Sequence, residues 1–246
     1  MLFSYLFLSP SVWLIACAVI PAGVLLSYIN KKDRLEKEPP KLLAGLVLWG
    51  IAATFLAVIS ETLLEGILSL FCRPGTRRYN IIMYFVIVAG SEEGFKYLLL
   101  RRRTWHSPEF NCRFDAVVYA VFVSLGFALW ENIGYVMSYG MATALARALT
   151  AVPGHACFGV FMGACYGMAK KCDNFGFTGP ARFWSILSFL APALIHGCYD
   201  YIATAQEGNS SSMFAAFIGV IFFISFLIVK NLSNHDKFIS RQGYYF

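Results

Sequence analysis

Two adjacent glutamates and a lysine interrupt a long apolar stretch of this sequence. Glu92, Glu93 and Lys96 lie within residues 81–100, a run long enough for a helix to cross a bilayer. A single charge at the middle of a membrane costs about 2.5–3.5 kcal/mol even on the lenient insertion scales. Three charges so close together therefore indicate side chains that face a protein interior and take part in function.

The positions of these charges within one helix predict their partners. Glu92 and Lys96 are four residues apart and share a helix face, so they form a local ion pair. Glu93 points about 100° away, toward a neighbouring helix. Because Lys96 neutralises only one carboxylate, we expect Glu93 to need a proton, a metal ion or a hydrogen-bond donor from elsewhere in the chain.

Further polar groups follow within later apolar runs. Glu131 and Asn132 are adjacent, His155 follows a helix-weakening Pro-Gly pair, and His196 and Asp200 share one helix face at a spacing of four residues. At a rise of about 1.5 Å per residue, these groups and the Glu pair fall between the membrane midplane and the outer leaflet. We therefore expect them to line one cavity that water reaches from outside.

Composition sets the class of protein that must position these groups. The chain has 246 residues, of which 58% are hydrophobic and only 14% charged, and its mean hydropathy is +0.62. Average soluble domains carry about 25% charged residues. The sequence predicts an all-α, polytopic membrane protein with a single membrane domain over residues 1–246. The expected spans are residues 11–29, 42–60, 81–100, 116–137, 147–169, 183–204 and 213–230.

The basic residues orient these spans. Most of the 20 Lys and Arg residues fall in the first, third and fifth loops and in the C-terminal tail. Cytoplasmic loops carry such an excess, so we expect the N-terminus outside and the C-terminus in the cytoplasm of a bacterial-type cell membrane. The net charge of +6 is explained by this orientation and does not indicate nucleic-acid binding. Met1–Ser4 lacks the basic start of a signal peptide.

The polar set suits hydrolysis by an activated water. A carboxylate acts as general base toward water, and a metal ion or a histidine donor stabilises the oxyanion. Two histidines with carboxylates also form an acceptable zinc set. No HExxH or GxSxG motif occurs. A proton-coupled transporter or ion channel is an alternative, because such residues also relay protons. A non-catalytic receptor or chaperone is a third.

Three short motifs carry a resemblance to a known family. Glu92-Glu93-x-x-Lys96, Phe127-x-x-x-Glu131 and His196-x-x-x-Asp200 resemble those of the PrsW intramembrane proteases, as do residues 33–39 and the His155 segment. The likeness covers about residues 30–205. It implies a helical core like that of the related CAAX prenyl endopeptidases and Abi proteins. It also implies site-1 cleavage of a membrane-spanning anti-sigma factor on its extracytoplasmic side.

The leading hypothesis is therefore an intramembrane endopeptidase of the metalloprotease or glutamate type. We predict catalytic roles for Glu92, Glu93, Lys96 and Asn132. We predict that Glu131, His155, His196 and Asp200 bind a metal ion, with Zn²⁺ as the candidate, or polarise the scissile carbonyl. The expected partners are the bilayer and a single-span membrane protein.

Other polar stretches are expected to be structural. Composition predicts that the loop over residues 30–40 is a solvated connector, and that Glu61 and Glu65 form a solvated end of the second span. Residues 206–246 are expected to supply a last structural helix and a polar tail. The seven cysteines form no CxxC pair, so neither a zinc knuckle nor a disulfide framework is indicated.

Overall fold

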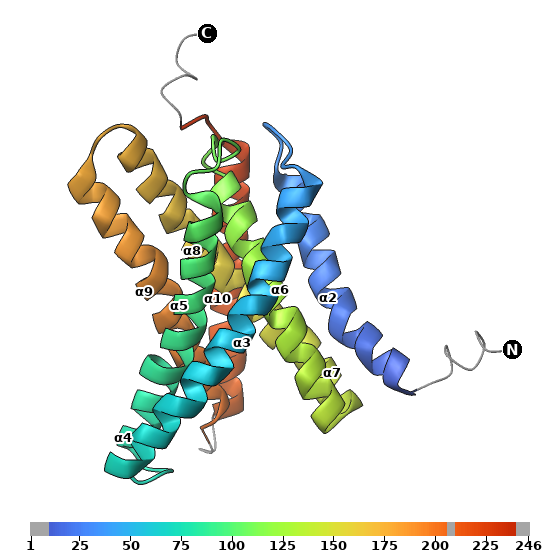
Figure 1. The fold of residues 1–246 in the computed structure, drawn as a ribbon. Helices are drawn as coiled ribbons and strands as arrows, with labels where there is room; N and C mark the ends of the chain where they lie inside the picture. Colours follow the sequence, from blue (N-terminus) through green and yellow to red (C-terminus); the bar gives the residue numbers. More distant parts are fainter. Residues whose placement is uncertain (1–9, 206–209, 240–246) are drawn as a thin grey trace, which may run out of the picture.

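The chain folds into a bundle of helices (Figure 1). The computed structural model describes residues 10–205 and 210–239. Within these ranges the one β pairing is an isolated antiparallel bridge between Cys112 and Phe238. The helical elements are α2 (Pro10–Lys32), α3 (Pro40–Phe71), α4 (Arg77–Ile81), η1 (Ile82–Val88), α5 (Ala89–Thr104), α6 (Asp115–Tyr139), α7 (Met141–Leu149), α8 (Ala151–Asn174), α9 (Thr178–Ala203) and α10 (Ser210–Asn234).

The all-α membrane architecture predicted from composition is confirmed. Within the described ranges, six helical stretches are long and apolar enough to cross a membrane. The predicted span at residues 81–100 is also helical, but it is divided among α4, η1 and α5. It falls outside the six because it is divided in this way and carries the charged residues Glu92, Glu93 and Lys96.

Helix α6 lies at the centre of the bundle (Figure 1). Every residue from 116 to 128 is buried. Helix α8 packs closely against it through Gly159, Gly163 and Gly167, which recur at every fourth position. A Cβ atom at Gly163 would lie 2.5 Å from the Cα atom of Val117. Small residues at this spacing let membrane helices approach until their backbones touch.

Two further close crossings bring the polar helices together. Helix α3 meets α6 at Gly50, where an added Cβ would lie 2.1 Å from the carbonyl oxygen of Val123. Helix α9 meets η1 at Gly197, where an added Cβ would lie 2.5 Å from the Phe85 ring. Because Gly197 follows His196 directly, this contact holds the histidine against the helix that carries the Glu pair.

The η1 segment is a π-helix, which the sequence pattern did not predict. Its wide turns are visible where the N–H of Ala89 donates to the carbonyl of Tyr84, five residues earlier. Such segments are rare in proteins, and those that do occur are often found at functional sites. This one ends one turn before Glu92, so it sets the rotation at which the Glu pair enters the bundle.

The second span is longer than predicted. Helix α3 runs to Phe71, beyond the expected end at residue 60, because the apolar pattern continues through Leu63, Leu64 and Ile67. Glu61 therefore lies inside a helix, and the prediction of a solvated helix end there is wrong.

The first loop also differs from its prediction as a solvated connector. Asp33 and Glu38 are only 1% and 6% exposed. The loop packs against distant segments, since Asn111 donates a 3.0 Å hydrogen bond to Glu36 and Arg34 donates one to Asn234. These contacts join residues far apart in the sequence, so composition alone does not reveal them.

Candidate active site

The charges that interrupt the apolar stretch form a buried ion cluster on α5. The ammonium of Lys96 donates to Glu93 Oε1 at 2.8 Å and to Glu92 Oε2 at 3.2 Å. Lys96 and Glu93 are fully buried, and the Lys96 ammonium lies 3.9 Å from the centre of the Phe127 ring. Buried charges are tolerated when they are paired in this way. Lys96 thus forms ion pairs with both glutamates, whereas the sequence predicted a pair with Glu92 alone.

His155 enters the cluster from α8. Its Nε2 atom lies 2.8 Å from Glu131 Oε2 on α6, and its Nδ1 atom lies 3.1 Å from the Lys96 ammonium. An ammonium only donates hydrogen bonds, so Nδ1 must accept from Lys96. Nε2 then carries the hydrogen and donates it in the bond to Glu131. The tautomer of His155 follows from these two partners.

His196 enters from α9 with a matching arrangement. Its Nδ1 atom lies 2.9 Å from Glu93 Oε1, and its Nε2 atom lies 3.3 Å from Asp200 Oδ2. The expected contact between His196 and Asp200, one helical turn apart, is therefore present. The expectation that Glu93 finds a partner on another helix is met by the same histidine.

The two histidines share one pattern. Each imidazole is held at Nε2 by a carboxylate, from Glu131 or Asp200, and presents Nδ1 toward the cluster on α5. A carboxylate behind a histidine fixes the ring and raises its basicity, as it does in metal sites. Their rings meet edge to face at a centroid distance of 5.4 Å.

The short helix α7, which overlaps the start of the predicted span 147–169, completes the cluster. Arg147 on α7 pairs with Glu131 Oε2 at 2.9 Å, and its Nε donates to Asn132 Oδ1 at 2.9 Å. The guanidinium also covers the Tyr135 ring at 4.0 Å. Glu131 is thus held by a histidine and an arginine together.

These groups face a cavity of about 400 Å³ between α3, η1, α6, α8 and α9. Glu92 lines it, whereas Glu93 lies behind it. The charged and polar side chains on its wall include Glu61, Glu92, Glu131, Arg147, His155, His196, Tyr199 and Asp200. The cavity supplies room for water or a peptide segment beside ionisable groups.

The structure brings together seven of the eight residues predicted for the site: Glu92, Glu93, Lys96, Glu131, His155, His196 and Asp200. Asn132 is directed elsewhere. Its amide donates to the carbonyl of Ala18 at 3.1 Å, and its oxygen accepts from Arg147. Its contacts are those of a residue that joins α2, α6 and α7.

Sequence reasoning missed Glu61 and Arg147. Glu61 reaches the cavity because Thr54, Ala57, Val58 and Glu61 share one face of α3. The sequence shows this periodicity, but the predicted span ends at residue 60 and so leaves Glu61 out of the helix. Arg147 had no such signal, because its contacts depend on how α7 folds back over α6.

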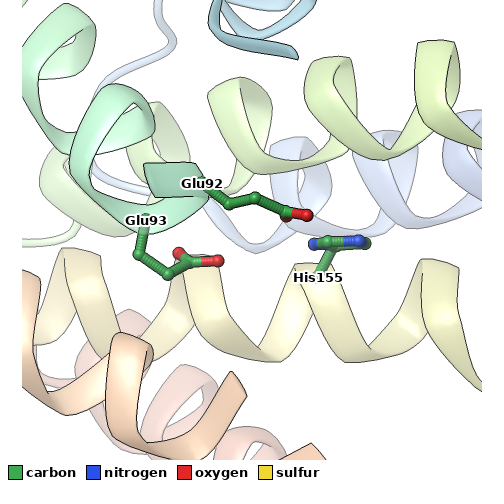
Figure 2. Close-up of side chains that lie close together, drawn as sticks. All are labelled: Glu92, Glu93 and His155. Carbon is green, nitrogen blue, oxygen red and sulfur yellow. The ribbon is translucent and has the colours of Figure 1, made fainter. Parts of the chain in front are cut away.

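Three of the side chains form a candidate metal centre. Ligand atoms of Glu92, Glu93 and His155 all lie within 4.8 Å of one another. Figure 2 shows Glu92 extending from α5 toward the His155 ring, with Glu93 beside it on the same helix. The Lys96 ammonium contacts all three residues, so a cation already occupies the centre of the group.

Comparison with known proteins places this geometry in a family. The model for the PrsW family intramembrane metalloproteases matches residues 38–229. Protease PrsW of Geobacillus kaustophilus is 35% identical over 79% of this chain and 81% of its own length. Protease PrsW of Bacillus subtilis is 32% identical over 78% and 83%, and that of Halalkalibacterium halodurans is 29% identical over 91% and 99%. No solved structure matches.

These matches agree with the fold and the buried acid–histidine set, and they favour proteolysis over transport or a non-catalytic role. They extend the likeness seen in the motifs to the last helix. The chain therefore belongs to the PrsW family of intramembrane proteases.

Proposed function

We propose that this protease cleaves a single-span membrane protein of the anti-sigma factor type at a bond held in the cavity beside Glu92. The observation that carries this proposal is a cavity inside a bundle of membrane helices, walled by Glu92, Glu131, His155, His196 and Asp200. A peptide there lies beside a carboxylate and two histidines, away from bulk solvent.

Glu92 is the general base in this proposal. It is the member of the Glu pair that lines the cavity, and its carboxylate lies within reach of a water there. General base catalysis by a positioned carboxylate contributes about 10²–10⁴-fold to rate. The Lys96 ammonium lies 3.2 Å from Glu92 Oε2 and favours the ionised carboxylate, which is the form that takes a proton from water.

Glu93 is a positioning residue. It is fully buried and holds both Lys96 and His196 through one oxygen. It thereby fixes the two groups that surround Glu92. Glu131 and Asp200 act in the same way on His155 and His196, which differs from the sequence prediction that they ligate a metal directly.

The donor set fits a metal ion. Glu92, Glu93, His155 and His196 would hold it, since a ligand atom of His155 lies within 4.8 Å of the Glu pair, His196 Nδ1 faces Glu93, and Glu93 Oε2 has no hydrogen-bond partner. Zn²⁺ accepts this mixture of nitrogen and oxygen ligands. When bound, the metal supplies Lewis acidity toward the scissile carbonyl and lowers the pKa of water. Because Lys96 now contacts three of these four residues, its ammonium must move aside for a metal.

The orientation follows the basic residues. The loops on one side carry most Lys and Arg residues, so we propose that this side is cytoplasmic and that the N-terminus lies outside. His155 near the start of α8 and His196 near the end of α9 then lie in the extracytoplasmic half. Cleavage there corresponds to a site-1 event, and we treat residues 1–246 as one membrane domain.

Co-expression tests the proposal. Single-span anti-sigma factors from the same genome, each tagged at both ends, are expressed with the protease and followed by immunoblot. The wild-type chain is expected to shorten one of them within its extracytoplasmic part, and Glu92→Gln is expected to leave it intact. Glu65→Gln is the matched control, because Glu65 is an exposed glutamate one turn beyond Glu61. Full cleavage by Glu92→Gln would overturn the assignment of Glu92.

A further inference from the structure

A second cluster of acidic groups lies at the other end of α6. The first loop, the connection between α5 and α6, and the segment after α10 meet there (Figure 1). Asp115 begins α6 and Glu131 lies 16 residues later, so the two sites are about 24 Å apart along the helix. No residue of this cluster lines the catalytic cavity.

The start of α6 and the segment after α10 supply its centre. Atoms of Cys112, Asp115 and Asp236 lie within 4.8 Å of one another, at the spacing of metal ligands. Asp115 Oδ2 accepts from the N–H groups of Asn111 and Cys112, and Asp236 Oδ1 accepts from the N–H groups of Phe114 and Lys237. These bonds use one oxygen of each carboxylate and fix its direction.

The remaining oxygens are the observation that points to a ligand. Asp33 is 1% exposed, and neither of its carboxylate oxygens has a hydrogen-bond partner. Glu38 Oε2 and Asp236 Oδ2 are also buried without a partner. A buried polar atom left unpaired costs about 1–3 kcal/mol, and more when it is charged. Among the residues that the structure describes, no group donates a hydrogen bond to these four oxygens on three carboxylates, which leaves them open to a positive partner.

The carboxylates face one another closely enough to interact. Asp236 and Glu36 raise the pKa of Asp33, and Asp33 and Glu109 raise that of Glu38. Burial is the larger cause for both, and it brings the pKa of Asp33 to about 6 and that of Glu38 to about 7. The positive charge of Lys37 opposes the rise in the pKa of Asp33 without cancelling it.

The nearby cations do not close the deficit. The ammonium of Lys37 donates to the backbone carbonyls of Asn30 and Asp33, and Arg34 donates to Asn234. Arg113 faces Asp236 and lowers its pKa, yet its own Nε is buried without a partner. One guanidinium, which faces Asp236, and one ammonium, which is held by the Asp33 carbonyl, therefore stand against four carboxylates.

We propose that Asp33, Glu38, Asp115 and Asp236, with the thiol of Cys112, bind one divalent cation at this end of the bundle. Carboxylate oxygens suit Mn²⁺ or Mg²⁺, and a thiol ligand favours Zn²⁺. The cation neutralises the buried carboxylates and joins the first loop to the start of α6 and to the segment after α10. The site is structural and distinct from the catalytic centre.

The test measures cation-dependent stability. Purified full-length protein is stripped with EDTA and then titrated with Mn²⁺ alone or Zn²⁺ alone, with unfolding followed by tryptophan fluorescence. Saturation is expected to raise the Tm by about 5 °C or more. Asp33→Asn is the main variant, because it removes charge without breaking a hydrogen bond, and Glu38→Gln is the second variant if the first fails to fold. Asp173→Asn, an exposed aspartate near the end of α8, is the matched control.

Glu93→Gln separates this site from the catalytic one. The Tm rise should persist in Glu93→Gln and Asp173→Asn and be lost in Asp33→Asn and Glu38→Gln. Elemental analysis should find one ion fewer per chain in Asp33→Asn and Glu38→Gln than in the wild type, and one ion per chain should remain in Glu93→Gln even if the catalytic centre loses its metal. Whichever of Mn²⁺ and Zn²⁺ gives the larger rise identifies whether the oxygens or the thiol dominate. The proposal is overturned if the wild type responds to neither ion, if Asp33→Asn responds as the wild type does, or if Glu93→Gln removes the response.

Discussion

The two polar clusters at opposite ends of α6 solve the burial of carboxylates in different ways. At the catalytic end, every carboxylate that contacts the histidines also belongs to an internal pair with Lys96, Arg147 or an imidazole. At the other end, Asp33 has no such pair among the described residues, and Glu38 and Asp236, like Glu93, each keep one unpaired oxygen. A site deep in a membrane must carry its own counter-ions, whereas one at the membrane edge can take a cation from water.

The charged side chains also have different roles in the two clusters. In the catalytic cluster, removal of a side chain changes chemistry or breaks a pair that the fold needs. In the acidic cluster, removal of a carboxylate relieves repulsion unless a cation is bound. Replacing a carboxylate by an amide should therefore change activity or stability by different amounts in the two clusters. In one case the change in stability should have the opposite sign.

The largest effect is expected for Glu92→Gln. The amide cannot take a proton from water, so cleavage should fall about 10²–10⁴-fold. Folding should be preserved, because Lys96 keeps its closer bond to Glu93. The measurement is the rate of substrate cleavage in proteoliposomes, with Tm as the check on folding. Retention of more than a tenth of the rate would assign the general base elsewhere.

Lys96→Met should damage the fold rather than the chemistry alone. It leaves Glu92 and Glu93 buried without their shared ammonium, and removal of one partner of a buried pair costs about 3–5 kcal/mol. SDS titration of the purified protein measures this loss. The double variant with Glu92→Gln should recover part of the stability and none of the activity. An unchanged SDS midpoint in Lys96→Met would show that the cluster does not depend on this pairing.

Glu131→Gln and Asp200→Asn should have intermediate effects. Each removes the carboxylate that holds one histidine at Nε2, and loss of such partners reduces metal affinity or activity about 10–100-fold. Cleavage rate and metal content, measured together, test both variants. If these residues are direct metal ligands, as the sequence predicted, each variant should instead lose the metal and all measurable cleavage.

The sequence revealed much of this site because membrane burial makes charge conspicuous. Glu92, Glu93 and Lys96 were found from their energetic cost, and His196 and Asp200 from helical spacing. What the sequence does not reveal depends on contacts between distant segments, such as the bonds that Asn132 makes to Ala18 and Arg147.

The predicted end of the second span was wrong for a local reason. Glu61 was assigned to solvent because a span of average length ended before it, although α3 continues to Phe71. The π-helix that positions the Glu pair lies in an apolar run whose pattern predicts an ordinary helix. The burial of Asp33 and Glu38 was also hidden, because a charged loop has the same composition whether it is solvated or folded around a cation.

The smallest effect is expected for Asp33→Asn, and its sign tests the comparison most directly. In EDTA this variant should be slightly more stable than the wild type, by about 1 kcal/mol, because it removes a buried charge that accepts no hydrogen bond. Glu93→Gln should be less stable under the same conditions, because Glu93 accepts from both Lys96 and His196. Parallel SDS titrations of the two variants measure the difference. If both substitutions destabilise the protein in EDTA, Asp33 has a counter-ion within the chain and the two clusters do not differ as described. If Asp33→Asn is the more stable protein, its carboxylate is kept for a partner that comes from outside the chain.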